Sequence, residues 1–224
     1  MSRKALLLAL AASLVCFSAN AADKPKVDLK AYRAQGGMVS TITPVFSELV
    51  KISLPAGFER AEEKTTGNVH YIQQRVPAGE TLERWSQMIT LTGAKGLGAK
   101  PGLDPRAFAN LIAGGFAKAC PQTFAGGGLG AGRIGGHDGF IAWASCGTVN
   151  YGASTHAESA IIIAVKGMAD YYTVQWAERL PASARPLAFD EAKWRARLAQ
   201  LNPIRFCPRL PGEPPPYASC ADAK

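Results

Sequence analysis

The side chains best suited to proton transfer near neutral pH are three histidines, His70, His137 and His156. Nucleophilic catalysis needs a nucleophile, a base and an orienting group held together, and the sequence has no Gly-x-Ser-x-Gly turn. We expect His137 and His156 to begin neighbouring antiparallel strands, which places them roughly 30 Å apart. His156 and Glu158 can face the same way, as half of a metal site or as a solvated strand end. We therefore predict no catalytic residue, no metal site and no cofactor.

The most unusual segment is the glycine-rich run over residues 126–139 (GGGLGAGRIGGHDG). It contains a literal Gly-x-Gly-x-x-Gly at Gly130, Gly132 and Gly135, but the dinucleotide-binding motif needs a strand before it and a helix after it. Here a strand is predicted to follow, so nucleotide binding is rejected. A flexible loop is the expected structure. Its backbone N–H groups, together with Arg133, would suit an anion.

Four side chains are predicted to converge beside this loop. Antiparallel pairing brings the start of the strand at 138 next to the end of the strand at 166, so Arg133, His137, Lys166 and Asp170 form a predicted binding rim. Eight of the fourteen residues in 126–139 are glycine, each with a large ordering entropy. We expect the rim to bind an unknown protein or an anionic ligand. The alternative is a disordered loop without a binding role.

The cysteine pattern predicts disulfides. Cys16 lies in the N-terminal apolar segment, which leaves Cys120, Cys146, Cys207 and Cys220. An even number in an oxidising compartment indicates two bonds, whereas a zinc site would need closer spacing. We predict Cys120–Cys146, which joins a helix end to the sheet, and Cys207–Cys220, which closes a proline-rich tail.

The N-terminus reads as a signal peptide over residues 1–21. Arg3 and Lys4 precede the apolar stretch 5–17 (ALLLALAASLVCF), and Ala19-Asn20-Ala21 suits cleavage after Ala21. The apolar stretch is too short to span a membrane, and no later segment is longer. We therefore predict a periplasmic or secreted bacterial protein without a transmembrane segment after cleavage.

The charge pattern argues against nucleic acid as a partner. The formal net charge is +8 at pH 7, and removal of the two basic residues of the signal peptide lowers it to +6. The Lys and Arg residues are scattered and do not form the basic and aromatic clusters of nucleic-acid-binding proteins. The 47% hydrophobic content indicates a folded chain.

Secondary-structure patterns predict an α+β fold with a mostly antiparallel sheet and helices on both faces. The expected organisation is a signal peptide at 1–21, a flexible leader at 22–44, one domain at 45–201 and a proline-rich tail at 202–224. Strands are expected at 45–54, 58–64, 69–76, 87–92, 138–149, 158–166 and 171–178, and helices at 105–119 and 191–201.

Several short motifs resemble the PsbP-like superfamily of α/β/α sandwiches. They are KISLPAGF, a Tyr-bearing strand, GETLERW and MITLTG, followed by a helix, a strand meander and a final helix. The resemblance covers residues 45–201 and implies a binding or assembly module without transferable active-site residues. The sequence thus predicts an exported, non-catalytic binding or accessory module. The alternatives are an inhibitor or immunity-type protein that blocks a partner, and a hydrolase with an unrecognised site.

Overall fold

The computed structural model describes residues 28–151 and 154–221. The predicted signal peptide and its cleavage site lie outside these residues. The strands are β1 (Met38–Val45), β2 (Glu48–Pro55), β3 (Phe58–Thr66), β4 (His70–Pro77), β5 (Gln87–Ala94), β6 (Phe124–Ile134), β7 (His137–Tyr151), β8 (Ser154–Lys166), β9 (Tyr171–Leu180) and β10 (Arg205–Pro208). The helices are α1 (Leu29–Ala34), α2 (Pro105–Ala119), α3 (Glu191–Leu201) and α4 (Ala218–Ala221), with a short 3₁₀ helix η1 (Leu97–Ala99).

A seven-stranded antiparallel sheet forms the centre of the molecule, in the order β3-β4-β5-β9-β8-β7-β6. Strand β8 lies inside the sheet and is apolar on both sides. Ile161 and Ile163 belong to the core on one face, and Ile162 and Ala164 to the core on the other. A central strand that is covered on both faces is expected to be apolar on both sides, as β8 is.

Helix α2 covers one face of the sheet over β6, β7 and β8. Asp104 begins it, because its carboxylate accepts a hydrogen bond from the Ala107 N–H and Pro105 occupies the first helical position. Phe108 packs on Tyr171 and on the small residues of β7 and β8. The N-cap and the apolar periodicity, both visible in the sequence, therefore explain why this helix forms.

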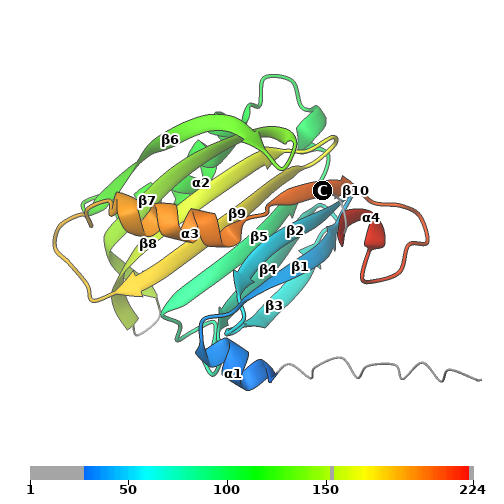
Figure 1. Cartoon of the computed structure of the whole chain (residues 1–224). Helices are drawn as coiled ribbons and strands as arrows, with labels where there is room; N and C mark the ends of the chain where they lie inside the picture. Colours follow the sequence, from blue (N-terminus) through cyan, green and yellow to red (C-terminus); the bar gives the residue numbers. More distant parts are fainter. Residues whose placement is uncertain (1–27, 152–153, 222–224) are drawn as a thin grey trace, which may run out of the picture.

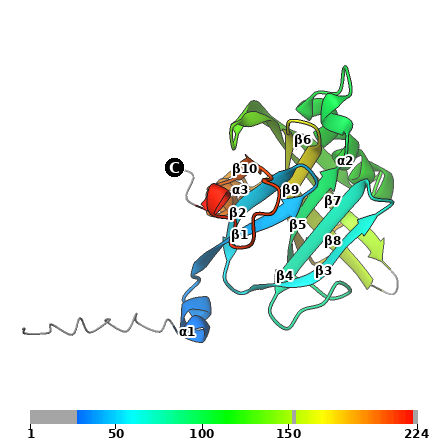
Figure 2. The same cartoon turned by 90° about the vertical axis from the view of Figure 1, so that its right-hand side faces the viewer.

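The opposite face is covered by α3 and by a second sheet of three strands, in the order β1-β2-β10. Figure 1 shows these elements in front of the large sheet and α2 behind it, and Figure 2 shows the layers after a quarter turn. Trp194 and Leu201 of α3 are buried in the same core as Val50 and Ile52 of β2. The predicted α+β class with helices on both faces is confirmed, and the second sheet is an addition that the sequence did not predict.

Both ends of the expected domain need correction. The predicted flexible leader at 22–44 contains α1 and most of β1, which pairs with β2 from Met38↔Pro55 to Val45↔Glu48. The predicted tail from 202 contains β10, which pairs with β2, while Ile204 and Phe206 enter the main core. Strand β1 forms a hairpin with β2, and β10, from the far end of the chain, pairs with the other side of β2, so the backbone groups of β2 have partners on both sides.

The glycine-rich run is also corrected: it is a strand and not a loop. Residues Phe124–Ile134 pair with β7 from Phe124↔Cys146 to Ile134↔His137, with a bulge between Gly128 and Gly130. Only Gly135 and Gly136 form the connection. Their φ values of 57° and 91° fit a two-residue hairpin turn.

The cysteines are joined as Cys120–Cys146 and Cys207–Cys220, the pairs expected from the sequence. The first bond ties the end of α2 to β7. The second holds α4 against β10. Among the described residues, no helix is long and apolar enough to cross a membrane.

Candidate functional site

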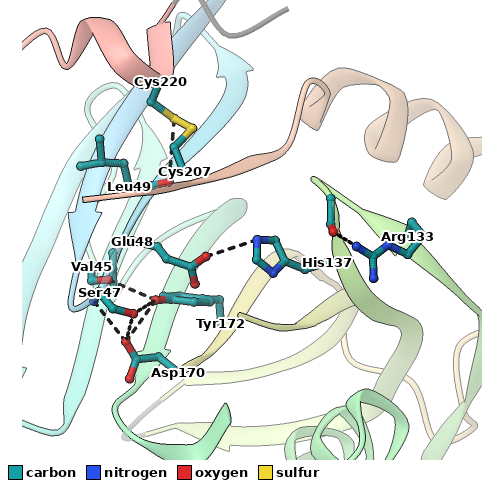
Figure 3. A network of polar contacts seen from close by, with 11 residues as sticks. Val45, Ser47, Glu48, Leu49, Arg133, His137, Asp170, Tyr172, Cys207 and Cys220 are labelled. Carbon is teal, nitrogen blue, oxygen red and sulfur yellow. Dashed lines mark hydrogen bonds and ion pairs between the residues drawn. A yellow bond between two sulfur atoms is a disulfide. The ribbon is translucent and has the colours of Figure 1, made fainter. Parts of the chain in front are cut away.

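The structure divides the predicted binding rim between the two faces of the large sheet. Alternation along β7 and β8 places Lys166, like its pairing partner Asp138, on the face that α2 covers. His137 points to the opposite face, toward the small sheet, as Figure 3 shows. The four predicted residues therefore do not form one cluster. His137 and Asp170 both lie where the two sheets meet, His137 beside Glu48 and Asp170 beside Ser47 and Tyr172. Arg133 and Lys166 instead flank Asp138 in the strand register.

Glu48 and His137 form a buried polar contact between the two sheets. His137 Nε2 lies 3.2 Å from Glu48 Oε1, and the Glu48 side chain is fully buried. Burial raises the pKa of Glu48, and the facing His137 opposes this effect. The imidazole of His137 also meets the ring of Phe206 edge-on. His137 is thus occupied in fastening β7 to β2 and β10.

Asp170 is also occupied by structural hydrogen bonds, and it is only 1% exposed. Its carboxylate accepts bonds from the Ser47 backbone N–H at 3.1 Å, the Ser47 hydroxyl at 2.6 Å, the Gly96 N–H at 2.7 Å and the Tyr172 hydroxyl at 3.2 Å. Burial acts to raise the pKa of Asp170, but these donors hold it below its usual value. The residue ties three turns together (Figure 3) and offers no free acceptor to a ligand.

Arg133 lies at the exposed end of β6. Its guanidinium forms an ion pair of 2.7 Å with Asp138 and donates to the Gly136 carbonyl. Both charged side chains are about two-thirds exposed, so the pair is weak and can exchange partners. Of the four predicted residues, Arg133 therefore has the position best suited to a binding role.

A groove runs beside Arg133 between β6 and α3. Its volume is about 590 Å³, within the usual range for binding sites. Its floor is the glycine-rich part of β6 with Ile141, and its wall is formed by Phe189, Trp194 and Leu198. We call this hollow the β6–α3 groove. It is mainly apolar, and its charged side chains, such as Glu191 and Arg195, are paired with each other.

The glycines of β6 fall into two groups, according to what an added Cβ would meet. A Cβ at Gly126 or Gly128 would collide with the ring of Phe124 or Phe140, so these glycines are required by internal packing. A Cβ at Gly132 would meet nothing within 4 Å, and its φ is not positive. Gly130 also has open space, although its φ of 151° favours glycine. Gly132 borders the groove, and no internal contact excludes a side chain at this position.

A second polar cluster lies on β8, at the far end of the sheet. Ser154 Oγ is 3.4 Å from His156 Nδ1, and His156 Nε2 is 3.6 Å from Glu158 Oε2. Burial and the nearby Arg179 lower the pKa of His156, while burial raises that of Glu158. The pair noticed in the sequence thus shares one face and gains a serine. Among the described residues, no group of three His, Cys, Asp or Glu side chains could hold a metal ion.

Glu48 is the polar residue between the two sheets that sequence reasoning missed. Alternation along β2 places Glu48 in line with Val50, Ile52 and Leu54, which are all buried. A carboxylate at the first position of a buried strand face is a signal for a partnered charge. Its partner His137 could not be identified, because the two residues belong to different sheets.

No protein-family profile and no functionally characterised protein matches the sequence significantly. Among solved structures, the Ran-binding protein Mog1p of Saccharomyces cerevisiae is similar, with 11% identity, a TM-score of 0.41, and coverage of 72% of this chain and 84% of Mog1p. LpqN of Mycobacterium tuberculosis, involved in cell envelope biogenesis, has 10% identity, a TM-score of 0.37, and coverage of 82% and 99% respectively. These likenesses are too low to assign a role to this chain.

Proposed function

We propose that the protein is an exported, non-catalytic binding or accessory module that contacts another protein through β6 and the β6–α3 groove. The observation that carries this is Gly132. It borders a mainly apolar groove, and nothing inside the molecule requires glycine at this position. Glycine in a strand weakens the strand and often marks a place where another chain approaches closely.

The groove favours a protein partner over a free anion. Two arginines border it: Arg133 is paired with the carboxylate of Asp138, and Arg195 with that of Glu191. The exposed side chain of Leu129, at 42%, extends the apolar surface beyond the groove. A mainly apolar surface with balanced charges at its border is typical of protein interfaces.

Export to the periplasm, cleavage after Ala21 and descent from the PsbP-like superfamily belong to the same proposal. Export is supported by the signal-like N-terminus and by two disulfides, which persist in oxidising compartments. The PsbP-like relationship is supported by the motifs within residues 45–201 and by the sandwich architecture.

The test is photo-cross-linking in the native host from position 129, with position 69 as the control. Val69 is 55% exposed and lies in the turn between β3 and β4, at the opposite side of the large sheet from β6. A partner that is cross-linked only from position 129 is then purified and mixed with the wild type and with Gly132→Val. We expect a stoichiometric complex that Gly132→Val weakens at least tenfold. Equal affinity of the two proteins would refute this binding surface.

A hydrolase is the second candidate, because Ser154, His156 and Glu158 lie in line on one strand face. In such a reaction His156 would accept the proton of the Ser154 hydroxyl as the serine attacks an acyl carbon, and would pass it to the leaving group as the bond to that group breaks. Water would then hydrolyse the acyl-serine, and Glu158 would orient the imidazole throughout. Both separations exceed a normal hydrogen bond between catalytic groups.

A further inference from the structure

We propose that the partner of this protein binds by strand addition, as an extended segment that pairs with the free edge of β6 and points apolar side chains into the β6–α3 groove. This inference rests on the proposed function and specifies the partner's conformation and chemistry. It is supported by a difference between the two edges of the large sheet.

The edge formed by β3 is protected against pairing. Its sequence FERAEEKTT carries five charged residues, and most of its side chains are exposed. Charged side chains on an edge strand discourage the approach of another strand. The β6 edge, FAGGGLGAGRI, carries one charged residue, Arg133, and five glycines. Within the described part of the chain, β6 pairs only with β7, so its outer backbone groups face solvent.

The bulge between Gly128 and Gly130 limits where a new strand can pair. Regular pairing between β6 and β7 resumes at Gly130 and continues to Ile134. Gly130 and Gly132 both have open space where a Cβ would lie, and both occupy the face that is turned toward α3. A segment that adds to Gly130–Ile134 would therefore have the groove beside it.

The groove determines the chemistry of the segment. Successive side chains of a strand point to opposite faces, so every second side chain of an added segment would turn toward α3. There it would meet Ile141, Phe189 and Leu198, which are all partly buried and apolar. The segment is thus expected to carry β-branched or other apolar residues at alternate positions. Because the neighbouring charges are paired, it needs no particular charge.

A second copy of this chain does not fit the same site. In an antiparallel pairing of two copies centred on Ala131, Gly130 of each copy would lie opposite Gly132 of the other, and neither glycine would bring a side chain into a groove. Within Gly130–Ile134, only Ile134 could offer an apolar side chain to that face, and it already packs against the main core. The occupant is therefore a segment of a different protein.

The test uses three synthetic peptides with the disulfide-bonded mature protein. The first alternates Val and Thr between terminal Lys residues. The second has the same composition with the Val residues adjacent, and the third repeats the first with N-methyl groups on alternate peptide bonds. Affinity is measured by titration, and protection of β6 amides by hydrogen exchange. We expect the alternating peptide to bind at least tenfold more tightly than either control and to slow exchange along β6. No binding at about 1 mM peptide would overturn the proposal.

Two glycine variants connect the result to the groove. Gly132→Val should abolish peptide binding without lowering the melting temperature. Gly57→Val, at a glycine with equally open space in the β2–β3 turn, should bind normally. If Gly132→Val does not fold, Gly132→Ala makes the same comparison with a smaller expected loss. One outcome would overturn strand addition but leave the groove as the binding surface. In it, the N-methylated peptide binds as tightly as the alternating peptide, and Gly132→Val blocks both. Binding that neither Gly132 variant reduces would overturn both proposals.

Discussion

Replacement of Asp170 by alanine tests whether this residue is part of the structure or of a ligand site. The substitution removes a carboxylate that is 1% exposed and that accepts four hydrogen bonds, two from backbone N–H groups and two from hydroxyls. The donors of Ser47, Gly96 and Tyr172 remain at the place where three turns meet. Water cannot reach them without opening the contact between the two sheets.

The cost follows from the number of donors that lose their acceptor. A buried donor without a partner costs about 1 to 3 kcal/mol, and the two backbone N–H groups are the least able to move. We therefore expect Asp170→Ala to lower the free energy of unfolding by about 3 to 5 kcal/mol. For a chain of this size, this corresponds to a fall in melting temperature of roughly 6 to 20 °C.

The assay is urea unfolding followed by tryptophan fluorescence, with Asp170→Asn as the matched control. Asparagine keeps the shape and one acceptor oxygen, so its loss should be smaller. The pH dependence has a defined sign. Because the pKa of Asp170 is lower in the folded state, its stabilisation is present above the unfolded pKa and is lost as the pH falls through the folded value. The difference between wild type and Asp170→Ala should therefore shrink in acid.

A loss below about 1 kcal/mol at neutral pH would refute this reasoning, since it would mean that the donors find other partners. If Asp170→Ala also abolished partner binding at unchanged stability, the role in a binding rim that the sequence suggested would be correct.

The remaining predictions concern the disulfides and Glu48. In the chain-entropy view, the 26-residue separation of Cys120 and Cys146 is worth about 3.5 kcal/mol and the 13-residue separation of Cys207 and Cys220 about 3 kcal/mol. Replacement of Cys120 and Cys146 by alanine should lower the melting temperature more, because this bond ties α2 to the large sheet. Replacement of Cys207 and Cys220 releases only the short helix α4 from β10. The opposite order of melting temperatures in calorimetry would contradict this prediction. Burial raises the pKa of Glu48 in the folded protein. Between the pKa of the unfolded chain and this higher value, the folded protein keeps a proton that the unfolded chain has lost, so the free energy of unfolding decreases as the pH rises through that range. Glu48→Gln should become more stable relative to wild type as the pH rises from acid to neutral, and a relative loss in urea titrations would contradict the assigned direction.

The elements that local patterns define were predictable from the sequence. Helices α2 and α3 have Asp104 and Asp190 as N-caps and a regular apolar stripe. Only two residues separate β7 from β8 and four separate β8 from β9, so their antiparallel pairing follows from chain connectivity. These signals depend on residues within one turn or one strand of each other.

The second sheet could not be predicted in the same way. Strand β10 pairs with β2 across about 150 residues, from Arg205↔Lys51 to Pro208↔Glu48. No local pattern distinguishes the short segment Arg205–Pro208 from an extended tail. What fixes it is the burial of Phe206 and Ile204 in a core that exists only after the rest has folded.

Strand β6 was missed for a different reason. Strand prediction relies on alternating side chains, and glycine has none. A glycine-rich run therefore reads as a loop, although the backbone of β6 pairs with β7 from His137 to Cys146. The inference that it was functionally unusual remains as a proposal, now attached to a strand edge and a groove.

The most direct test of the central claim compares two variants in cells that lack the native gene. One is Gly132→Val, which fills the β6–α3 groove. The other is the double variant His156→Gln and Glu158→Gln, which removes the polar pair beside Ser154. Both must be exported and folded to wild-type levels. We predict that Gly132→Val reproduces the phenotype of the gene deletion and that the double variant behaves as wild type. Full function of Gly132→Val together with loss of function in the double variant would contradict a binding role and favour catalysis.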